Sequence, residues 1–285
     1  DFLVEFFEQP GNYIDLIKRY EQGDNWRSIL HGEYGIEEAM DPMEVAKGIL
    51  FAEVEAGSPI DRYSELAATE TNRAADFCEF WQRNATRTYL EYTTDIEDNY
   101  DLTKAVIDSE SLDWHSDAFL GIDEGLLHLC LDRFGSVPEL DFPNEVPAVR
   151  RVVQRRMDCF WFQDGRADYW SVLDYGLSVI DKASDAIDSI EAEAYSTGEL
   201  SKEYTEQWWE VDAAYRNYIQ SASSLIQAID GLEAAREVVT GFYTRFLKAL
   251  NRDLADKIQS EPVLSSPQTG FWDRYVEASS GTAII

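Results

Sequence analysis

Cysteine is scarce in this chain: 285 residues contain three, Cys78, Cys130 and Cys159, and no two of them form a CxxC pair. This spacing argues against a disulfide-stapled scaffold and against a cysteine-rich zinc site, and it suits the reducing cytoplasm. No run of 18 apolar residues occurs, so we expect no membrane-spanning helix. No basic stretch leads into an apolar segment at the start, so we expect no signal peptide in these 285 residues.

Histidine is equally rare, and the common catalytic motifs are missing. The three histidines are His31, His115 and His128, and none follows a glutamate with the Glu-x-x-His spacing of di-iron bundles. Glu124 and His128 are spaced i, i+4, which can place two ligands on one metal, although a hydrogen-bonded His128 is the simpler interpretation. The sequence lacks GxxxxGK[ST], GxGxxG and GxSxG. We therefore expect no catalytic residue, metal site or cofactor site in this chain.

Positive charge, and lysine above all, is in short supply. Lys and Arg sum to 24 against 55 Asp and Glu, a formal charge of −31, and only seven of the 24 basic residues are lysine. Such a chain repels nucleic acid and anionic membranes, so we expect it to bind neither directly. Abundant acids spread along the sequence, with few lysines, predict a salt-adapted surface of the haloarchaeal type, because at about 1 M salt the Debye length is roughly 3 Å. An ordinary acidic face for a protein partner is the alternative.

One basic cluster stands out against this background. Arg150, Arg151, Arg155 and Arg156 fall within seven residues, and on a helix they form two adjacent rows. Such a cluster can bind a phosphate, a nucleic-acid backbone or an acidic partner face. Internal ion pairing with neighbouring helices is the alternative that the sequence leaves open. The aromatic residues that follow, 160–162, are typical of a core rather than of a base-stacking platform.

The apolar pattern predicts an all-α fold of about eight to ten helices, as an array or bundle. At 45% hydrophobic and 13% aromatic residues, the chain is too apolar for a disordered acidic tail. Asp41 and Pro42 mark one helix start, with Gly57 as its end. Further helices are expected at about 62–98, 117–134, 145–163, 166–195, 199–230 and 232–260. Pro138, Pro143 and Pro147 predict a hinge at 138–147 between lobes 1–137 and 148–280.

The last two of these helices carry matching apolar stripes. The first stripe has spacings of four and three residues, and the second follows Gly231 with similar spacings. The stripes consist of Tyr204, Trp208, Val211, Tyr215 and Tyr218, and of Val239, Phe242, Phe246, Leu250 and Leu254. Two amphipathic helices joined at a glycine predict a packed antiparallel hairpin.

Both ends of the sequence suggest elements that continue elsewhere. Residues 282–285, Thr-Ala-Ile-Ile, form a β-branched apolar run after an otherwise helical chain. We expect 281–285 to be the cut start of a following α/β domain, preceded by a short helix at about 271–276. The start, from Asp1 to Phe7, likewise reads as the middle of an element. The chain is therefore expected to be an interior piece of a longer protein.

Three stretches of the C-terminal third resemble the PglZ family, the alkaline-phosphatase-superfamily component of BREX phage-defence systems. The first is 206–216, in which aromatic residues precede an Asp-x-x-Tyr-Arg segment formed by Asp212, Tyr215 and Arg216. The second is 239–254, with Phe-Tyr and Phe-Leu pairs, and the third is 271–276 followed by 281–285. Together they cover about 80 residues. The rest of the chain matches only as a helical region of suitable size.

The resemblance implies a non-catalytic helical region used for scaffolding or partner docking. The phosphatase domain of the family follows such a region and would supply a divalent metal, zinc by the family's pattern, but its metal-binding aspartate lies beyond Ile285. Partners implied are other phage-defence proteins or the adjoining phosphatase domain. An independent acidic protein-binding module, unrelated to phosphatases, is the alternative, and an enzyme using the Glu124/His128 region is a third possibility.

Overall fold

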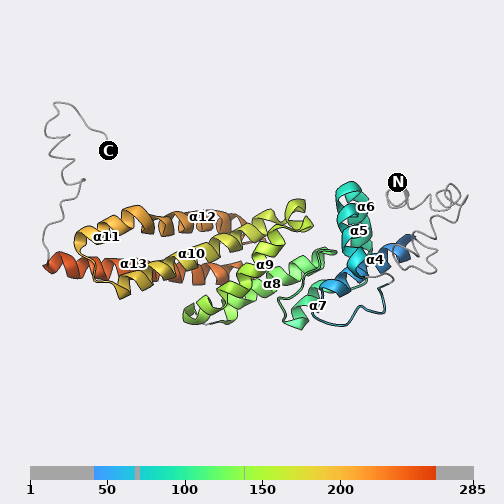
Figure 1. Ribbon diagram of the computed structural model, residues 1–285, viewed down its shortest axis with the longest axis horizontal. Coiled ribbons are helices and arrows are strands. Elements are labelled where there is room, and N and C mark those ends of the chain that lie inside the picture. Colours follow the sequence, from blue (N-terminus) through green and yellow to red (C-terminus); the bar gives the residue numbers. More distant parts are fainter. Residues whose placement is uncertain (1–41, 68–70, 138, 261–285) are drawn as a thin grey trace, which may run out of the picture. The chain divides into compact units, whose positions relative to one another are not determined.

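A computed structural model describes residues 42–67, 71–137 and 139–260, and in these ranges it confirms the all-α prediction, with helices and no strand (Figure 1). The expected strand at 282–285, the short helix at 271–276 and the segment at 1–7 lie outside the described residues. None of the described helices is long and apolar enough to cross a membrane. The helices are α4 (Pro42–Gly57), α5 (Thr71–Asn84), α6 (Thr86–Glu97), α7 (Leu102–Ser109), α8 (Leu120–Ser136), α9 (Val146–Met157), α10 (Ala167–Ala192), α11 (Thr197–Glu203), α12 (Trp209–Leu225) and α13 (Leu232–Ser260).

The chain divides into two compact units. The first contains residues 1–174 and 221–235, and the second contains 175–220 and 236–285. The segment 138–147, expected as a hinge, lies inside the first unit, and the units divide within α10, α12 and α13. Around this segment the ring of Phe142 is buried and lies 4.2 Å from that of Phe134, which anchors the 3₁₀ helix η3 (Glu139–Asn144) to α8.

The prediction of one long helix at about 62–98 is wrong. Residues 58–67 are irregular, and α5 and α6 are separate helices because the backbone breaks at Ala85, whose φ is −145°. The break lets residues on its two sides meet: the ring of Trp81 stands edge-on to that of Tyr89 at 5.3 Å, and its indole N–H donates to Thr88 at 3.0 Å. A continuous helix would keep positions eight residues apart about 12 Å from one another. No Gly or Pro marks this break in the sequence.

Helices α7 and α8 pack closely because α8 carries glycine where they meet. A Cβ atom at Gly125 would lie 2.6 Å from the Cβ of Val106, which is a fully buried residue of α7. Gly135, in the last turn of the same helix, has ordinary space: its Cβ would lie 3.6 Å from the Cβ of Ala234. The two glycines therefore give a matched pair for substitution.

Gly125→Ala is expected to destabilise the chain, whereas Gly135→Ala is expected to stabilise it. Alanine is favoured over glycine in a helix by up to about 1 kcal/mol. At Gly125, overpacking costs typically about 1–3 kcal/mol, so the net result is a loss. Chemical denaturation of both variants measures the difference. Equal gains in stability at the two positions would show that α7 and α8 do not pack as closely as described.

The chain enters α10 through a kink that lies within the first unit. The π-type turn η4 (Phe162–Arg166) contains Gly165 at φ +101°, a conformation that glycine adopts without strain. Helix α10 begins directly after it, at Ala167. The kink turns the chain between α9 and α10 and places Arg166 and Trp170 against α8, as described below.

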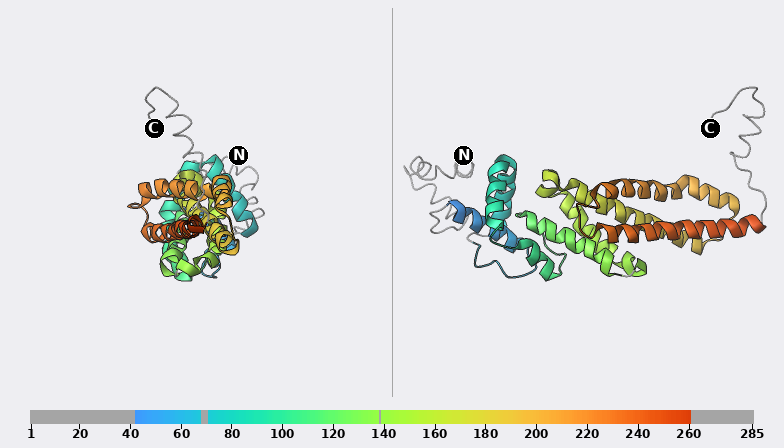
Figure 2. Two further views of the ribbon diagram at one scale, coloured as in Figure 1. Left: turned by 90° about the vertical axis from the view of Figure 1, so that its left-hand side faces the viewer. Right: turned by 180° about the vertical axis from the view of Figure 1, so that it is seen from behind.

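The second unit is built from long helices that run side by side: α10, α12 and α13 (Figures 1 and 2). Helix α11 begins with a capping box, in which Ser196 and Glu199 satisfy each other's backbone N–H groups. The π-type turn η5 (Tyr204–Trp208) continues α11 into α12. Helix α13 has the predicted bounds, and Gly231 precedes it at φ +82°.

The two apolar stripes face the interior, as the hairpin prediction requires. In the first stripe Trp208, Val211 and Tyr218 are buried, and in the second the buried residues are Val239, Phe242 and Phe246. The outer members, Leu250 and Leu254, are half-buried. Tyr215 of α12 stacks on Tyr243 of α13, with ring centroids 3.9 Å apart and an interplanar angle of 10°. The seam between α12 and α13 is therefore aromatic.

Candidate functional site

The four arginines predicted as a basic cluster lie on α9, but the structure gives them different surroundings. Pro147 sits in the first turn of α9, which suits its fixed φ, and Arg155 and Arg156 lie in the last turn, where positive charge complements the helix dipole. Arg156 is buried, Arg155 and Arg150 are half-buried, and Arg151 is exposed. The cluster is therefore divided between a buried face and an open face of one helix.

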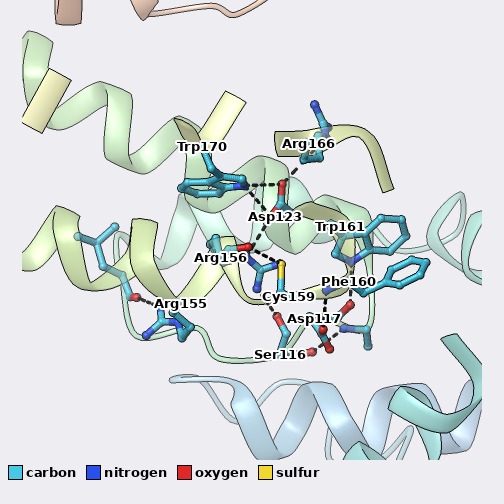
Figure 3. Close-up of polar contacts among 12 residues, drawn as sticks. Ser116, Asp117, Asp123, Arg155, Arg156, Cys159, Phe160, Trp161, Arg166 and Trp170 are labelled. Carbon is cyan, nitrogen blue, oxygen red and sulfur yellow. Dashed lines mark hydrogen bonds and ion pairs between the residues drawn. The ribbon is translucent and has the colours of Figure 1, made fainter. Parts of the chain in front are cut away.

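Arg156 forms a buried ion pair with Asp123 of α8 (Figure 3). Its Nε donates to the Asp123 carboxylate at 3.0 Å and its Nη1 to the carbonyl of Ser116 at 2.9 Å. The indole N–H of Trp170 also donates to the same carboxylate, at 3.0 Å. Burial raises the pKa of Asp123, while the guanidinium of Arg156 and the Trp170 hydrogen bond act to lower it. This network joins α8, α9 and α10, a structural role.

Arg166 and Glu124 form an ion pair at the edge of this network. Arg166 Nε also lies 4.0 Å from Asp123 and its guanidinium packs over the ring of Tyr169, 4.8 Å from the centroid. Glu124 is thereby engaged by an arginine, and His128, its suggested metal partner, is exposed. In the ranges 42–67, 71–137 and 139–260, no three His, Cys, Asp or Glu residues gather as a metal site would need.

A second buried acid lies beneath the segment that leads to α8. Glu53 of α4 accepts a hydrogen bond from the hydroxyl of Ser116 and is buried. Burial, helped by the negative charge of Asp117, raises the pKa of Glu53 to about 7. The Asp117 carboxylate accepts a hydrogen bond from the backbone N–H of Phe160 at 3.3 Å (Figure 3). These contacts tie the 116–117 segment to α4 on one side and to residues after α9 on the other.

The aromatic residues after α9 are part of this packing. Trp161 is buried, and its indole N–H donates to the carbonyl of Asp117 at 2.7 Å. The ring of Phe160 stands edge-on to that of Tyr89, 5.3 Å away. Residues 160 and 161 therefore serve the core, in agreement with the sequence prediction.

The open face of α9 borders a pocket of about 500 Å³ in the first unit. Arg151 and Arg155 lie on this side of α9, Arg133 comes from α8, and the segment between α7 and α8 contributes another wall. Arg155 donates from Nη2 to the carbonyl of Leu112 at 2.9 Å (Figure 3). The lining residues are Glu110, Ser111, Leu112, Asp113, His115, Arg133, Glu145, Ala148, Arg151, Val152 and Arg155.

Two of the four predicted arginines thus reach a pocket, and the other two do not. Arg150 lies 3.6 Å from Asp174, a pair that is about a third exposed. Sequence analysis missed Arg133, which lies outside the cluster, and Asp123, the partner of Arg156. A signal for Asp123 does exist: it lies next to Ile122 and three residues before Leu126, on the apolar side of α8, where an unpaired acid would be costly.

Comparisons with known proteins add nothing to this geometry: no family model, no curated protein and no solved structure matches the chain.

Proposed function

We propose that this chain is a non-catalytic helical scaffolding or partner-docking region of a PglZ-like phage-defence protein, whose following domain resembles a metal-dependent phosphohydrolase. One observation carries the proposal. Two residues of the Asp-x-x-Tyr-Arg stretch, on which the resemblance depends, hold helices together: Asp212 and Tyr215. Asp212 of α12 accepts hydrogen bonds from Tyr204 and, at 2.7 Å, from Tyr243 of α13, and Tyr215 stacks on that same Tyr243.

This bonding pattern suits a scaffold rather than an active site. The Asp212 carboxylate is engaged by two phenols. Partial burial and the hydrogen bond to Asp212 raise the pKa of Tyr243 to about 12, so this phenol stays protonated at neutral pH. A general acid or base needs a pKa near the working pH, which Tyr243 does not have. The contacts of Asp212 and Tyr215 with Tyr243 therefore hold α12 to α13, which is a structural role.

Trp209 favours the alternative, an independent acidic protein-binding module. It is one of the large apolar side chains exposed in the described residues, and Glu206 and Glu210 beside it are exposed too. An exposed tryptophan is a suitable anchor for a protein partner. The scaffolding region and the independent binding module are both non-enzymatic. They differ in whether a phosphatase-like domain follows the helical region.

A hydrolysis assay tests the non-catalytic proposal directly. The purified chain, with and without added zinc, is expected to hydrolyse p-nitrophenyl phosphate and its diester no faster than buffer does. Hydrolysis that is lost in Glu124→Gln or His128→Ala would overturn the proposal and establish the third possibility, an enzyme within this chain. The coding sequence after Ile285 then separates the two non-enzymatic functions: an apolar strand ending in aspartate supports the PglZ-like region, and a stop codon supports the independent module.

A further inference from the structure

The pocket beside α9 has one cationic wall, and its arginines are only partly engaged. Arg133 lies 3.9 Å from Glu145, so these two lining charges offset each other. Arg151 and Arg155 are spaced i, i+4 on α9 and so share a face of the helix. In the part of the chain that the structure describes, Arg151 makes no hydrogen bond or ion pair. It is therefore available to a ligand.

Arg155 offers a specific donor to the same space. Its Nη2 is occupied by the Leu112 carbonyl, but its Nε is buried and has no hydrogen-bond partner among the described residues. A buried charged donor without an acceptor costs free energy, so an acceptor at this place is favoured. Guanidinium groups bind phosphate with paired N–H donors, and the side chain of Arg155 is among those that line this pocket.

The wall formed by the segment between α7 and α8 carries two acids, which argues against a simple anion site. Glu110 and Asp113 belong to the segment between α7 and α8, and both are exposed. His115 lies beside them, and burial together with the charge of Arg155 lowers its pKa, so this imidazole is mainly neutral at pH 7. Carboxylates repel a bare anion but accept hydrogen bonds from hydroxyl and amino groups. A ligand that suits both walls carries an anionic end and a donor-bearing end.

The size of the pocket agrees with such a two-ended ligand. Small-molecule sites typically enclose about 300–1,000 Å³, and the 500 Å³ found here exceeds what one phosphate ion fills. Long nucleic acid is a poor candidate because the chain carries a formal charge of −31. A small molecule with one phosphate group adds little to that repulsion, and concentrated salt screens it.

We propose that this pocket binds a small phosphate monoester with a hydroxyl- or amino-bearing body. Arg151 and Arg155 hold the phosphate group, and Asp113 and Glu110 accept hydrogen bonds from the body of the ligand. This site lies in the first unit, whereas the α12–α13 contacts on which the scaffold proposal depends lie in the second. The proposal is that the ligand binds, and no reaction of the ligand is part of it.

Calorimetric titration in concentrated KCl tests the proposal with two probes, methyl phosphate and ribose 5-phosphate. Both are expected to bind saturably, and ribose 5-phosphate more tightly, because only it has hydroxyl donors for the acidic wall. Arg151→Gln should weaken both probes at least about tenfold, the loss of one charge-assisted hydrogen bond. Asp113→Asn should weaken ribose 5-phosphate and leave methyl phosphate unchanged or slightly improved.

Arg87→Gln is the matched control, because Arg87 is an exposed helical arginine of α6 that pairs with Glu91 and is not among the residues that line this pocket. It removes the same charge and should leave both affinities unchanged. Arg155→Lys keeps the charge but removes the paired donors, and it should weaken both probes. Absence of saturable binding, or equal losses in Arg151→Gln and Arg87→Gln, would reject the site. Equal affinity for the two probes would reject the two-ended ligand.

Discussion

Arg156→Met is expected to destabilise the chain by about 3–5 kcal/mol, since it leaves a buried carboxylate without its cation. The side chains of Arg156 and Asp123 are only 1% and 0% exposed. After the substitution, Asp123 would keep the indole N–H of Trp170 at 3.0 Å, and Arg166 at 4.0 Å could offset only part of its charge. Chemical denaturation followed by circular dichroism measures the loss. A typical domain has about 5–15 kcal/mol in total, so the effect is large.

The double variant Arg156→Met/Asp123→Asn separates charge from packing. Asparagine keeps an acceptor for Trp170 while removing the negative charge, so the double variant should recover a large part of the loss. The interaction energy from this cycle isolates the ion pair. Arg150→Gln is the control on the same helix: its pair with Asp174 is partly exposed, and such pairs contribute about 0–1 kcal/mol. If Arg156→Met cost no more than Arg150→Gln, the buried pair would not hold α8 to α9.

The arginine cluster shows how far sequence reasoning reaches on this chain. The helix and the i, i+4 rows are correct, because they depend on local spacing alone. Which row is buried depends on partners far along the chain, such as Asp123, which is 33 residues before Arg156. With 55 acidic residues, no sequence pattern selects that one. Internal pairing, one of the two alternatives that the sequence left open, holds for Arg150 and Arg156. The anion site stays a proposal, and it concerns Arg151 and Arg155.

Helix boundaries, too, are predicted correctly where the sequence signal is local and missed where they depend on tertiary contacts. The bounds of α13 follow from Gly231 and a long apolar stripe, both of which are local signals. The break at Ala85 has no local signal in the sequence. It is stabilised by the contacts of Trp81 with Tyr89 and Thr88 across the bend, and no local residue pattern reveals these. The close contact of α7 with α8 at Gly125 is likewise a tertiary contact. A single glycine within a helix does not predict it.

Trp208→Ala and Phe246→Ala are each expected to destabilise the second unit by about 3–5 kcal/mol, through lost burial and the cavity left behind. Trp208 is only 6% exposed, and the ring of Tyr195 stands edge-on to it at 5.6 Å. Phe246 of α13 is completely buried. Thermal unfolding should be recorded in concentrated KCl, where screening of the expected salt-adapted surface leaves enough stability to measure the loss.

Trp209→Ala is the control, because this neighbouring side chain points about 100° away around the helix and is 47% exposed. It should change stability by no more than about 0.5 kcal/mol, as surface substitutions usually do. A packed seam therefore requires a large loss at Trp208 and a small one at Trp209. Small and equal losses at Trp208 and Phe246 would mean that these residues are not core, and the stripe would then have to be a partner surface. A binding defect confined to Trp209→Ala, in a chain that folds normally, would instead place the docking surface on the exposed side of α12 that carries Trp209.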